Sequence, residues 1–407
     1  MQRSPSGPRL VRWCAPIAGV LRHSLAAAGL VLALLALSGP ASQAQVQGAG
    51  QPLTAGQQQT LRTTLNAGTL LLLAGRTESS YHAMAGDIAA ALQGDGELRV
   101  LPLAGAGGGR NLQDLVFLRG VDLAIVPANA LADSRAMEAL AGPGLARRLA
   151  YVSLLYGEEV HLLAHPDAAA PEDLRGKRIA VPAGDATAEL TARDLFARLE
   201  VPVEVVEMAP AEAVAGVRAR SLGAILLVGG KPVEAAARLP RDGRLRLLAL
   251  PYREAMGQGY APAALQAGDY PNLVPAGVVV ETVAVGAVLM TNTGRGYEES
   301  ARRLAKFVPA FFAAAADLKL VARHPKWREL NLGATLPGWP RLAAAEEWLR
   351  TAKEQQTANL QKAFDEFLRS TGAGAADISA AQRRKLFEDF VAWTRKSVGD
   401  GGTPRGR

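Results

Sequence analysis

The chain has 407 residues, a formal net charge of +7 and a single cysteine. This length is sufficient for two lobes with separate cores. No concentrated basic stripe is present, which argues against a nucleic-acid partner. Cys14 lies close to the N-terminus, so no disulfide is available to the rest of the chain.

Residues 1–44 have the pattern of a cleaved signal peptide. Four arginines without an acidic residue precede an apolar run at 25–37, and the small residues Ser42 and Ala44 follow it. The run is shorter than the roughly 20 residues of a spanning helix. Without these arginines, 41 basic residues stand against 38 acidic ones, a net charge of +3. We therefore expect export to the periplasm; the alternative is an uncleaved membrane anchor.

Residues 45–65 are predicted to be a loose N-terminal tail, after which short apolar strands alternate with helices. This alternation is typical of α/β folds with parallel sheets and right-handed crossovers. The predicted helices are 81–92, 110–118, 130–140, 187–199, 211–219, 233–238 and 297–316. The predicted strands are 70–74, 98–103, 122–127, 151–155, 161–164, 179–181, 203–207, 224–228, 245–250 and 283–290.

Two long apolar segments, 149–165 and 278–290, have the length of strands that cross between two lobes. We expect lobe 1 to comprise 66–157 with a return at 278–340, and lobe 2 to comprise 158–277. From residue 341 the pattern becomes that of charged helices, predicted to run to 397. Residues 398–407 are predicted to be disordered.

Polar clusters fall at the predicted carboxyl ends of the strands, where open α/β sheets bind ligands. The loop at 184–187 leads into a helix whose free N–H groups suit a carboxylate. Thr77, Ser79, Ser80 and Tyr81 bring hydroxyl groups to another helix start. The alternative for these serines is simple N-capping.

We compared the glycine-rich loop 105–110 and the segment 229–231 with two nucleotide-binding motifs. Arg110 occupies the last glycine position of the dinucleotide pattern, and Gly229-Gly230-Lys231 lacks the remainder of a P-loop. Arg110 and Asn111 instead suit a carboxylate clasp, because arginine binds carboxylates through two hydrogen bonds. The alternative is a surface arginine.

Catalytic and metal-binding patterns are not found. His161 and His165 lie in an extended segment, roughly 13 Å apart, which is too far for one metal ion. Ser79 and Ser80 lack the G-x-S-x-G elbow. Glu158 and Glu159 are expected to point to opposite faces of a strand. We therefore predict no enzymatic activity, no metal and no cofactor.

Six segments carry a family resemblance: GRTESSYHAMAG at 75–86, 105–112, DLAIV at 122–126, LYGEEVHLLAH at 155–165, DLRGKRIAV at 173–181 and GDATAELTAR at 184–193. Through them the chain resembles the TAXI family of solute-binding proteins, which serve TRAP transporters. It departs from the family pattern at Glu78, Ala83, Arg110, Asn129 and Asp185. The resemblance implies a two-lobed α/β fold of the type II periplasmic-binding-protein class, with parallel-rich sheets and here a C-terminal helical extension.

The resemblance also implies a receptor that closes on a small organic anion, a carboxylate or an amino-acid-like molecule, and delivers it to TRAP permease subunits. The alternative is a periplasmic ligand-sensing or partner-binding protein on the same scaffold. The predicted ligand contacts are Thr77, Ser79, Ser80, Tyr81, Arg110, Asn111 and Asn129 from lobe 1, with Thr187, Glu189 and Lys231 from lobe 2.

Overall fold

A computed structural model of the chain describes residues 52–93, 98–132, 144–294, 296–320, 322–370 and 379–399. The predicted signal peptide, residues 133–140 of the predicted helix 130–140, and residues 400–407 lie outside these ranges. The chain divides into two compact units, Met1–Gln59 and Thr60–Arg407. No helix among the described residues is long and apolar enough to cross a bilayer.

The prediction of a loose tail at 45–65 is wrong for its second half, because Ala55–Gly68 forms helix α1. Glutamine, leucine and arginine favour helices through their intrinsic propensity. The helix buries none of its residues, and Leu61 and Leu65 are about half exposed. It therefore lacks the apolar face by which helices are recognised in a sequence.

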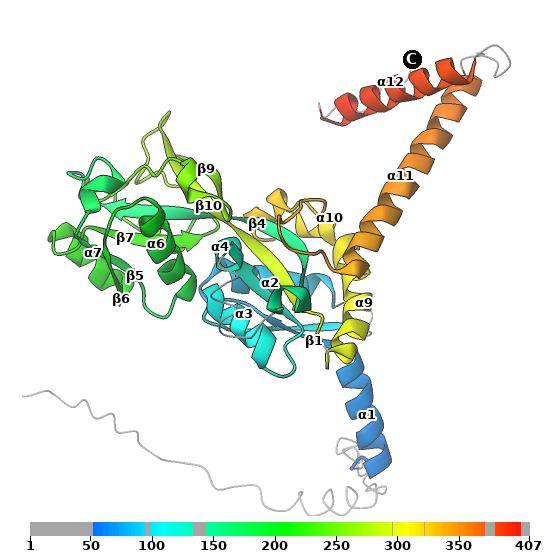
Figure 1. Ribbon diagram of the computed structural model, residues 1–407, viewed down its shortest axis with the longest axis horizontal. Coiled ribbons are helices and arrows are strands. Elements are labelled where there is room, and N and C mark those ends of the chain that lie inside the picture. Colours follow the sequence, from blue (N-terminus) through cyan, green and yellow to red (C-terminus); the bar gives the residue numbers. More distant parts are fainter. Residues whose placement is uncertain are drawn as a thin grey trace, which may run out of the picture. The chain divides into compact units, whose positions relative to one another are not determined.

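The strands form one sheet in the order β2-β1-β3-β10-β4-β7-β5-β6, with β8 and β9 attached to β4 and β10 (Figure 1). We use lobe 1 for the end that contains β1, β2 and β3, and lobe 2 for the end that contains β5, β6 and β7. Within each lobe these strands pair in parallel. The predicted two-lobed α/β fold with parallel-rich sheets is confirmed.

In lobe 1, helices cross between parallel strands as the alternating pattern predicts. The strands are β1 (Thr69–Leu73), β2 (Arg99–Leu103) and β3 (Leu123–Pro127). The helices that follow them are α2 (Ser80–Ala91), α3 (Gly108–Phe117) and α4 (Ala128–Ala132). The returning chain adds α9 (Glu298–Ala313), α10 (Ala315–Leu318) and the short helix η4 (Pro325–Glu329).

Lobe 2 repeats this arrangement, with its strands and helices close to the predicted positions. It contains β5 (Arg178–Pro182), α6 (Ala186–Arg198), β6 (Glu204–Met208), α7 (Pro210–Arg218), β7 (Ala224–Gly229) and α8 (Glu234–Ala237). Lobe 2 also contains the 3-10 helices η2 (Pro171–Leu174) and η3 (Glu254–Met256), while η1 (Leu145–Arg148) directly precedes β4. Strand β8 is only Arg246–Leu247, shorter than predicted, and β9 (Tyr260–Gln266) was not predicted.

Two long antiparallel strands connect the lobes, β4 (Leu149–Ala164) and β10 (Val279–Asn292) (Figure 1). The predicted strands 151–155 and 161–164 are therefore two parts of β4. Strand β10 pairs with β4 from Leu149 to Glu159. Strand β7 of lobe 2 pairs with β4 from Glu159 onward. Glu158 and Glu159 thus lie where the chain passes from one lobe to the other.

Three apolar clusters make up the core. One packs α2 and α9 on lobe 1 around Phe307, Phe311 and Trp327. A second lies on lobe 2 around Val217, Leu239 and Tyr270. The largest includes Leu112 and Leu115 of α3 together with Leu195 and Phe196 of α6, so it is shared by the two lobes.

The C-terminal extension is helical, as predicted. Helix α11 (Ala343–Ser370) packs Trp348 edge-on against Phe312 of α9. Helix α12 (Ala380–Gly399) packs Phe387 and Phe390 on Phe364 of α11. It continues beyond the predicted end of ordered helix at residue 397.

Candidate ligand-binding site

A cavity of about 800 Å³ lies between the two lobes. Lobe 1 contributes the residues before and within the first turn of α2, together with His324 from the returning chain. Lobe 2 contributes the ends of β5 and β7, one face of α7 and the segment around α8. This volume is in the range of small-molecule sites.

Ser79 and Ser80 line this cavity, and both also have structural contacts. Ser79 is the N-cap of α2, where its Oγ accepts the N–H of His82. Ser80 Oγ donates to Glu158 Oε1 at 2.6 Å and accepts the N–H of Gly230 at 3.4 Å. Ser80 therefore connects α2 of lobe 1 to the loop after β7 in lobe 2.

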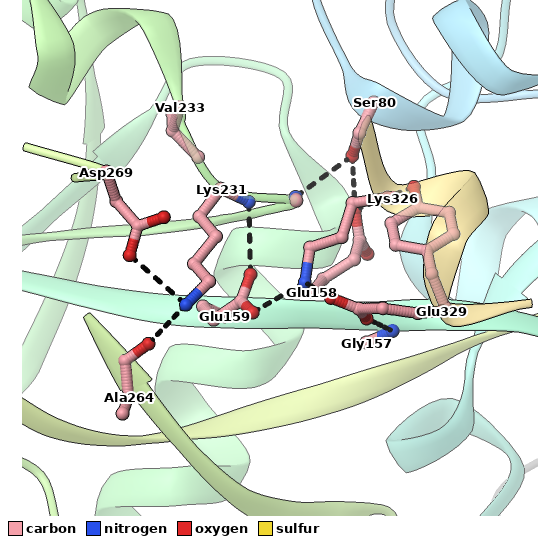
Figure 2. A network of polar contacts seen from close by, with 12 residues as sticks. Ser80, Gly157, Glu158, Glu159, Lys231, Val233, Ala264, Asp269, Lys326 and Glu329 are labelled. Carbon is pink, nitrogen blue, oxygen red and sulfur yellow. Dashed lines mark hydrogen bonds and ion pairs between the residues drawn. The ribbon is translucent and has the colours of Figure 1, made fainter. Parts of the chain in front are cut away.

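Beneath Ser80, Glu158 is buried at the crossover between the lobes (Figure 2). Tyr156 donates its hydroxyl proton to Glu158 Oε1 at 3.4 Å, and Glu158 Oε2 has no partner among the described residues. Burial raises the pKa of Glu158 to about 7, against the lowering effect of the Ser80 hydrogen bond. Tyr81 is also buried, and burial together with the charge of Glu158 raises its pKa well above the usual value.

Glu159, the next residue of β4, belongs to a separate ionic cluster (Figure 2). Its carboxylate contacts the ammonium of Lys326 at 2.5 Å and accepts the N–H of Lys231 at 3.0 Å. Lys326 also contacts Glu329 at 2.6 Å. Burial raises the pKa of Glu159, while Lys326 opposes that rise. The two adjacent glutamates thus have different partners.

Lys231 lies in this cluster rather than on the cavity wall. Its ammonium donates to the carbonyl of Ala264 at 2.6 Å and pairs with Asp269 at 3.1 Å. These contacts connect the loop after β7 to β9. Lys231 thus positions the loop that carries Gly229 and Gly230, which do line the cavity.

At the start of α6, where the sequence predicts an anion site, the backbone N–H groups have partners within the protein itself. The N–H of Ala186 donates to the carbonyl of Ala106, and those of Thr187 and Ala188 donate to Asp185 Oδ1. These are the donors that a helix start leaves free. Asp185, the N-cap, supplies the negative charge that a ligand would have brought.

Thr187 and Asn129 hold the lobes together on this side. Thr187 Oγ1 accepts the N–H of Gly108 at 2.8 Å. Asn129 of α4 donates to Thr191 Oγ1 at 3.0 Å and to the hydroxyl of Tyr260 at 3.1 Å. Both side chains are buried. We refer to the contacts of Gly108 with Thr187 and of Asn129 with Thr191 and Tyr260 as the latch.

The remaining predicted contacts make other interactions. Asn111 is buried and donates to the carbonyls of Ala74 and Ile125. Arg110 is 66% exposed beside Asp114, Glu189 pairs with Arg193, and Thr77 donates to Glu78. Of the ten predicted residues, Ser79 and Ser80 alone line the cavity. In the described ranges no group of three or more His, Cys, Asp or Glu residues is arranged to hold a metal ion.

A family model described as the NMT1-like family matches residues 72–329 of the chain, which span both lobes. The chain belongs to the NMT1-like family. No curated protein matches it significantly.

Several solved structures resemble this NMT1-like protein. The periplasmic aliphatic sulphonate binding protein of Escherichia coli is 14% identical over 62% of this chain and 75% of its own, with a TM-score of 0.36. An amino acid ABC transporter substrate-binding protein from Streptococcus pneumoniae, bound to L-arginine, is 12% identical over 67% and 98%, with a TM-score of 0.39.

Sequence reasoning missed the cavity residues Arg76, Arg218 and His324 of this NMT1-like protein. The backbone N–H of His324 donates to Asp87, and its Nδ1 accepts the backbone N–H of Lys326. Asp87 and His324 are 237 residues apart, and no local pattern connects them. The position of Arg218 at the end of α7, on the same face as Val214, was the one available signal.

Proposed function

We propose that this protein is the extracytoplasmic solute-binding receptor of a TRAP-type transporter of the TAXI class. In this proposal, it captures a small organic anion in the periplasm and presents it to the membrane permease. One observation carries the proposal: a cavity whose walls come from two lobes that two long strands, β4 and β10, connect. A ligand that contacts both walls favours the closed arrangement. The TAXI-like segments at 75–86, 105–112 and 184–193 support the choice of class.

Ser79 and Ser80 remain proposed ligand contacts, and we add Arg76 and His324. These four residues lie on the lobe 1 wall. Arg76 is one third exposed and 3.5 Å from Glu78, so its guanidinium is accessible to a carboxylate. The latch residues are proposed to act through closure instead of direct contact.

Calorimetric titration tests the proposal. The protein is unfolded and refolded to remove bound ligand, then titrated with organic acids and amino acids. We expect heat with at least one of them, and loss of that heat in Arg76→Gln. Arg62→Gln on the exposed helix α1 is the matched control. Absence of heat with every compound, together with unchanged uptake after deletion of the gene, would contradict the proposal.

A second candidate function is ligand sensing through a protein partner, and the C-terminal extension favours it. Helices α11 and α12 lie beyond the matched residues 72–329. A chain that ends at Ser370 separates the two functions. Normal uptake by this shortened chain supports a role of α12 outside transport, whereas lost uptake assigns the helix to the transporter.

A further inference from the structure

The two walls of the cavity differ in chemistry. The lobe 2 wall is mainly aliphatic and includes Pro182, Pro210, Val214, Leu227, Val233 and Leu239. On α7, Pro210, Ala211 and Val214 lie on one face because they are spaced by about one turn. Val214 and Val233 are half-buried against the apolar cluster of lobe 2. This wall offers a ligand apolar contact.

The lobe 1 wall is polar and carries hydrogen-bond donors. Arg76 brings a guanidinium group, which lies 3.5 Å from the carboxylate of Glu78 on the same wall and is one third exposed. His324 Nδ1 accepts the N–H of Lys326, which leaves Nε2 as the protonated nitrogen of the neutral ring. Burial lowers the pKa of His324, so the ring stays neutral near pH 7. Both groups suit the oxygens of an acid.

The arginines at the lobe 2 end are already paired. Arg218 contacts Asp242 at 2.5 Å, and Arg238 pairs with Glu234 on α8. A second charged group on a ligand would therefore meet charges that are neutralised, or the aliphatic side chains between them. Placing an ion against such a wall is unfavourable.

We infer that the ligand is an organic acid with a sizeable apolar body, which lies on the lobe 2 wall while its carboxylate lies at Arg76 and His324. This rests on the proposed receptor function and narrows its ligand class. A short polar acid would contact the donors of lobe 1 and leave the wall of α7 and α8 without a partner.

Titration with a chain-length series tests this inference on the ligand-stripped protein. Butanoate, hexanoate and octanoate share one head group and differ in apolar length, and 3-phenylpropanoate adds an aromatic body. Each buried methylene contributes roughly a fourfold gain in affinity. We therefore expect octanoate to bind at least about tenfold more tightly than butanoate.

Three variants separate the two walls. Val214→Asp places a charge on the aliphatic wall and is expected to abolish the increase of affinity with the chain length of the acid. Val279→Asp, the same change at an exposed valine of β10, leaves the dependence unchanged. Arg76→Gln is expected to lower the affinity for every acid by the same factor. Circular dichroism and thermal unfolding confirm that each variant is folded.

Tighter binding of the longer acids, lost in Val214→Asp and kept in Val279→Asp, supports the inference. If succinate or glutamate binds as tightly as octanoate or more tightly, the inference is overturned and the receptor function stands. If no acid binds, both are overturned. Unchanged chain-length dependence in Val214→Asp overturns the placement of the apolar body.

Discussion

Thr187 of lobe 2 accepts a hydrogen bond from the backbone N–H of Gly108 in lobe 1, with 2.8 Å between Gly108 N and Thr187 Oγ1. Both residues lie in the first turn of a helix, Gly108 in α3 and Thr187 in α6, and the sequence predicts ligand contacts at both helix starts. The two helix starts contact each other across the lobe interface, and neither Gly108 nor Thr187 lines the cavity. This hydrogen bond therefore favours the closed arrangement of the lobes independently of any ligand.

We predict that Gly108→Ala shifts the protein towards an open arrangement. Gly108 has φ = +54°, and a Cβ atom there would collide with the carbonyl oxygen of Ala186. Because the clash is with backbone across the lobe interface, separation of the lobes relieves it. Spin labels on Cys residues introduced at Arg119 and Glu204, one on each lobe, measure the change as a longer label-to-label distance.

Gly109→Ala is the matched control for this prediction. A Cβ atom at Gly109 meets nothing within 4 Å, although Gly109 is the next residue of α3. We expect it to leave the distance distribution unchanged. An equal shift in both variants would show that the start of α3 responds to any added side chain, and the latch would then have no special role.

We predict that Asn111→Ala lowers stability and changes ligand affinity little. Its amide donates to the carbonyls of Ala74 and Ile125 and accepts the N–H of Gly107, so its loss leaves buried backbone groups unpaired. The expected loss is about 2–4 kcal/mol in the free energy of unfolding. Urea titration measures it, with the exposed Asn66→Ala as control. If the variant is stable but does not bind ligand, the result would support the prediction that Asn111 contacts the ligand.

Much of the fold was predictable because its strands are short apolar runs. Strands β1 and β3 follow the buried pattern closely. Strand β9, Tyr260–Gln266, was not predicted, because it contains Pro262 and alternates only weakly between buried and exposed positions. Helix α1 was not predicted, because it has no buried face.

The site was less predictable because it depends on how the lobes meet. The sequence indicates which loops lie at strand ends, and Ser79 and Ser80 are found on the cavity wall. It does not indicate that the start of α3 at Gly108 meets the start of α6 at Thr187. That contact depends on long-range packing between α3 and α6, for which no local pattern exists.

We predict that Lys326→Met destabilises the protein strongly. Lys326 is 2% exposed and neutralises Glu159, which is buried. Removing one partner of a buried ion pair costs about 3–5 kcal/mol, because the other charge is left without compensation. Urea unfolding at pH 7 measures this loss. Lys353→Met on the exposed face of α11 is the control.

The double variant Lys326→Met with Glu159→Gln tests the cause. The neutral amide at position 159 keeps an acceptor for the N–H of Lys231 and removes the uncompensated charge. We expect it to recover a large part of the lost stability. If the double variant is as unstable as Lys326→Met alone, packing by the lysine stem, and not charge, explains the effect.

The last prediction concerns the pH dependence of stability that arises from Glu158. Its pKa is about 7 in the folded protein and 4.5 as an ordinary value, so the folded state retains the proton at a pH where the unfolded state has lost it. Its stabilising contribution is therefore complete below pH 4.5 and is lost as the pH rises to about 7. A difference of this size corresponds to ~3 kcal/mol.

Glu158→Gln removes this titration and keeps the acceptor for the hydroxyl of Ser80. We expect the free energy of unfolding of the native protein, measured relative to this variant at pH 4.5, 5.5, 6.5 and 7.5, to fall with increasing pH. Glu204→Gln, which removes an exposed carboxylate of β6, should follow the native protein at every pH. A difference between native protein and Glu158→Gln that stays constant across these pH values would show that the Glu158 carboxyl does not carry its proton into the pH range near 7.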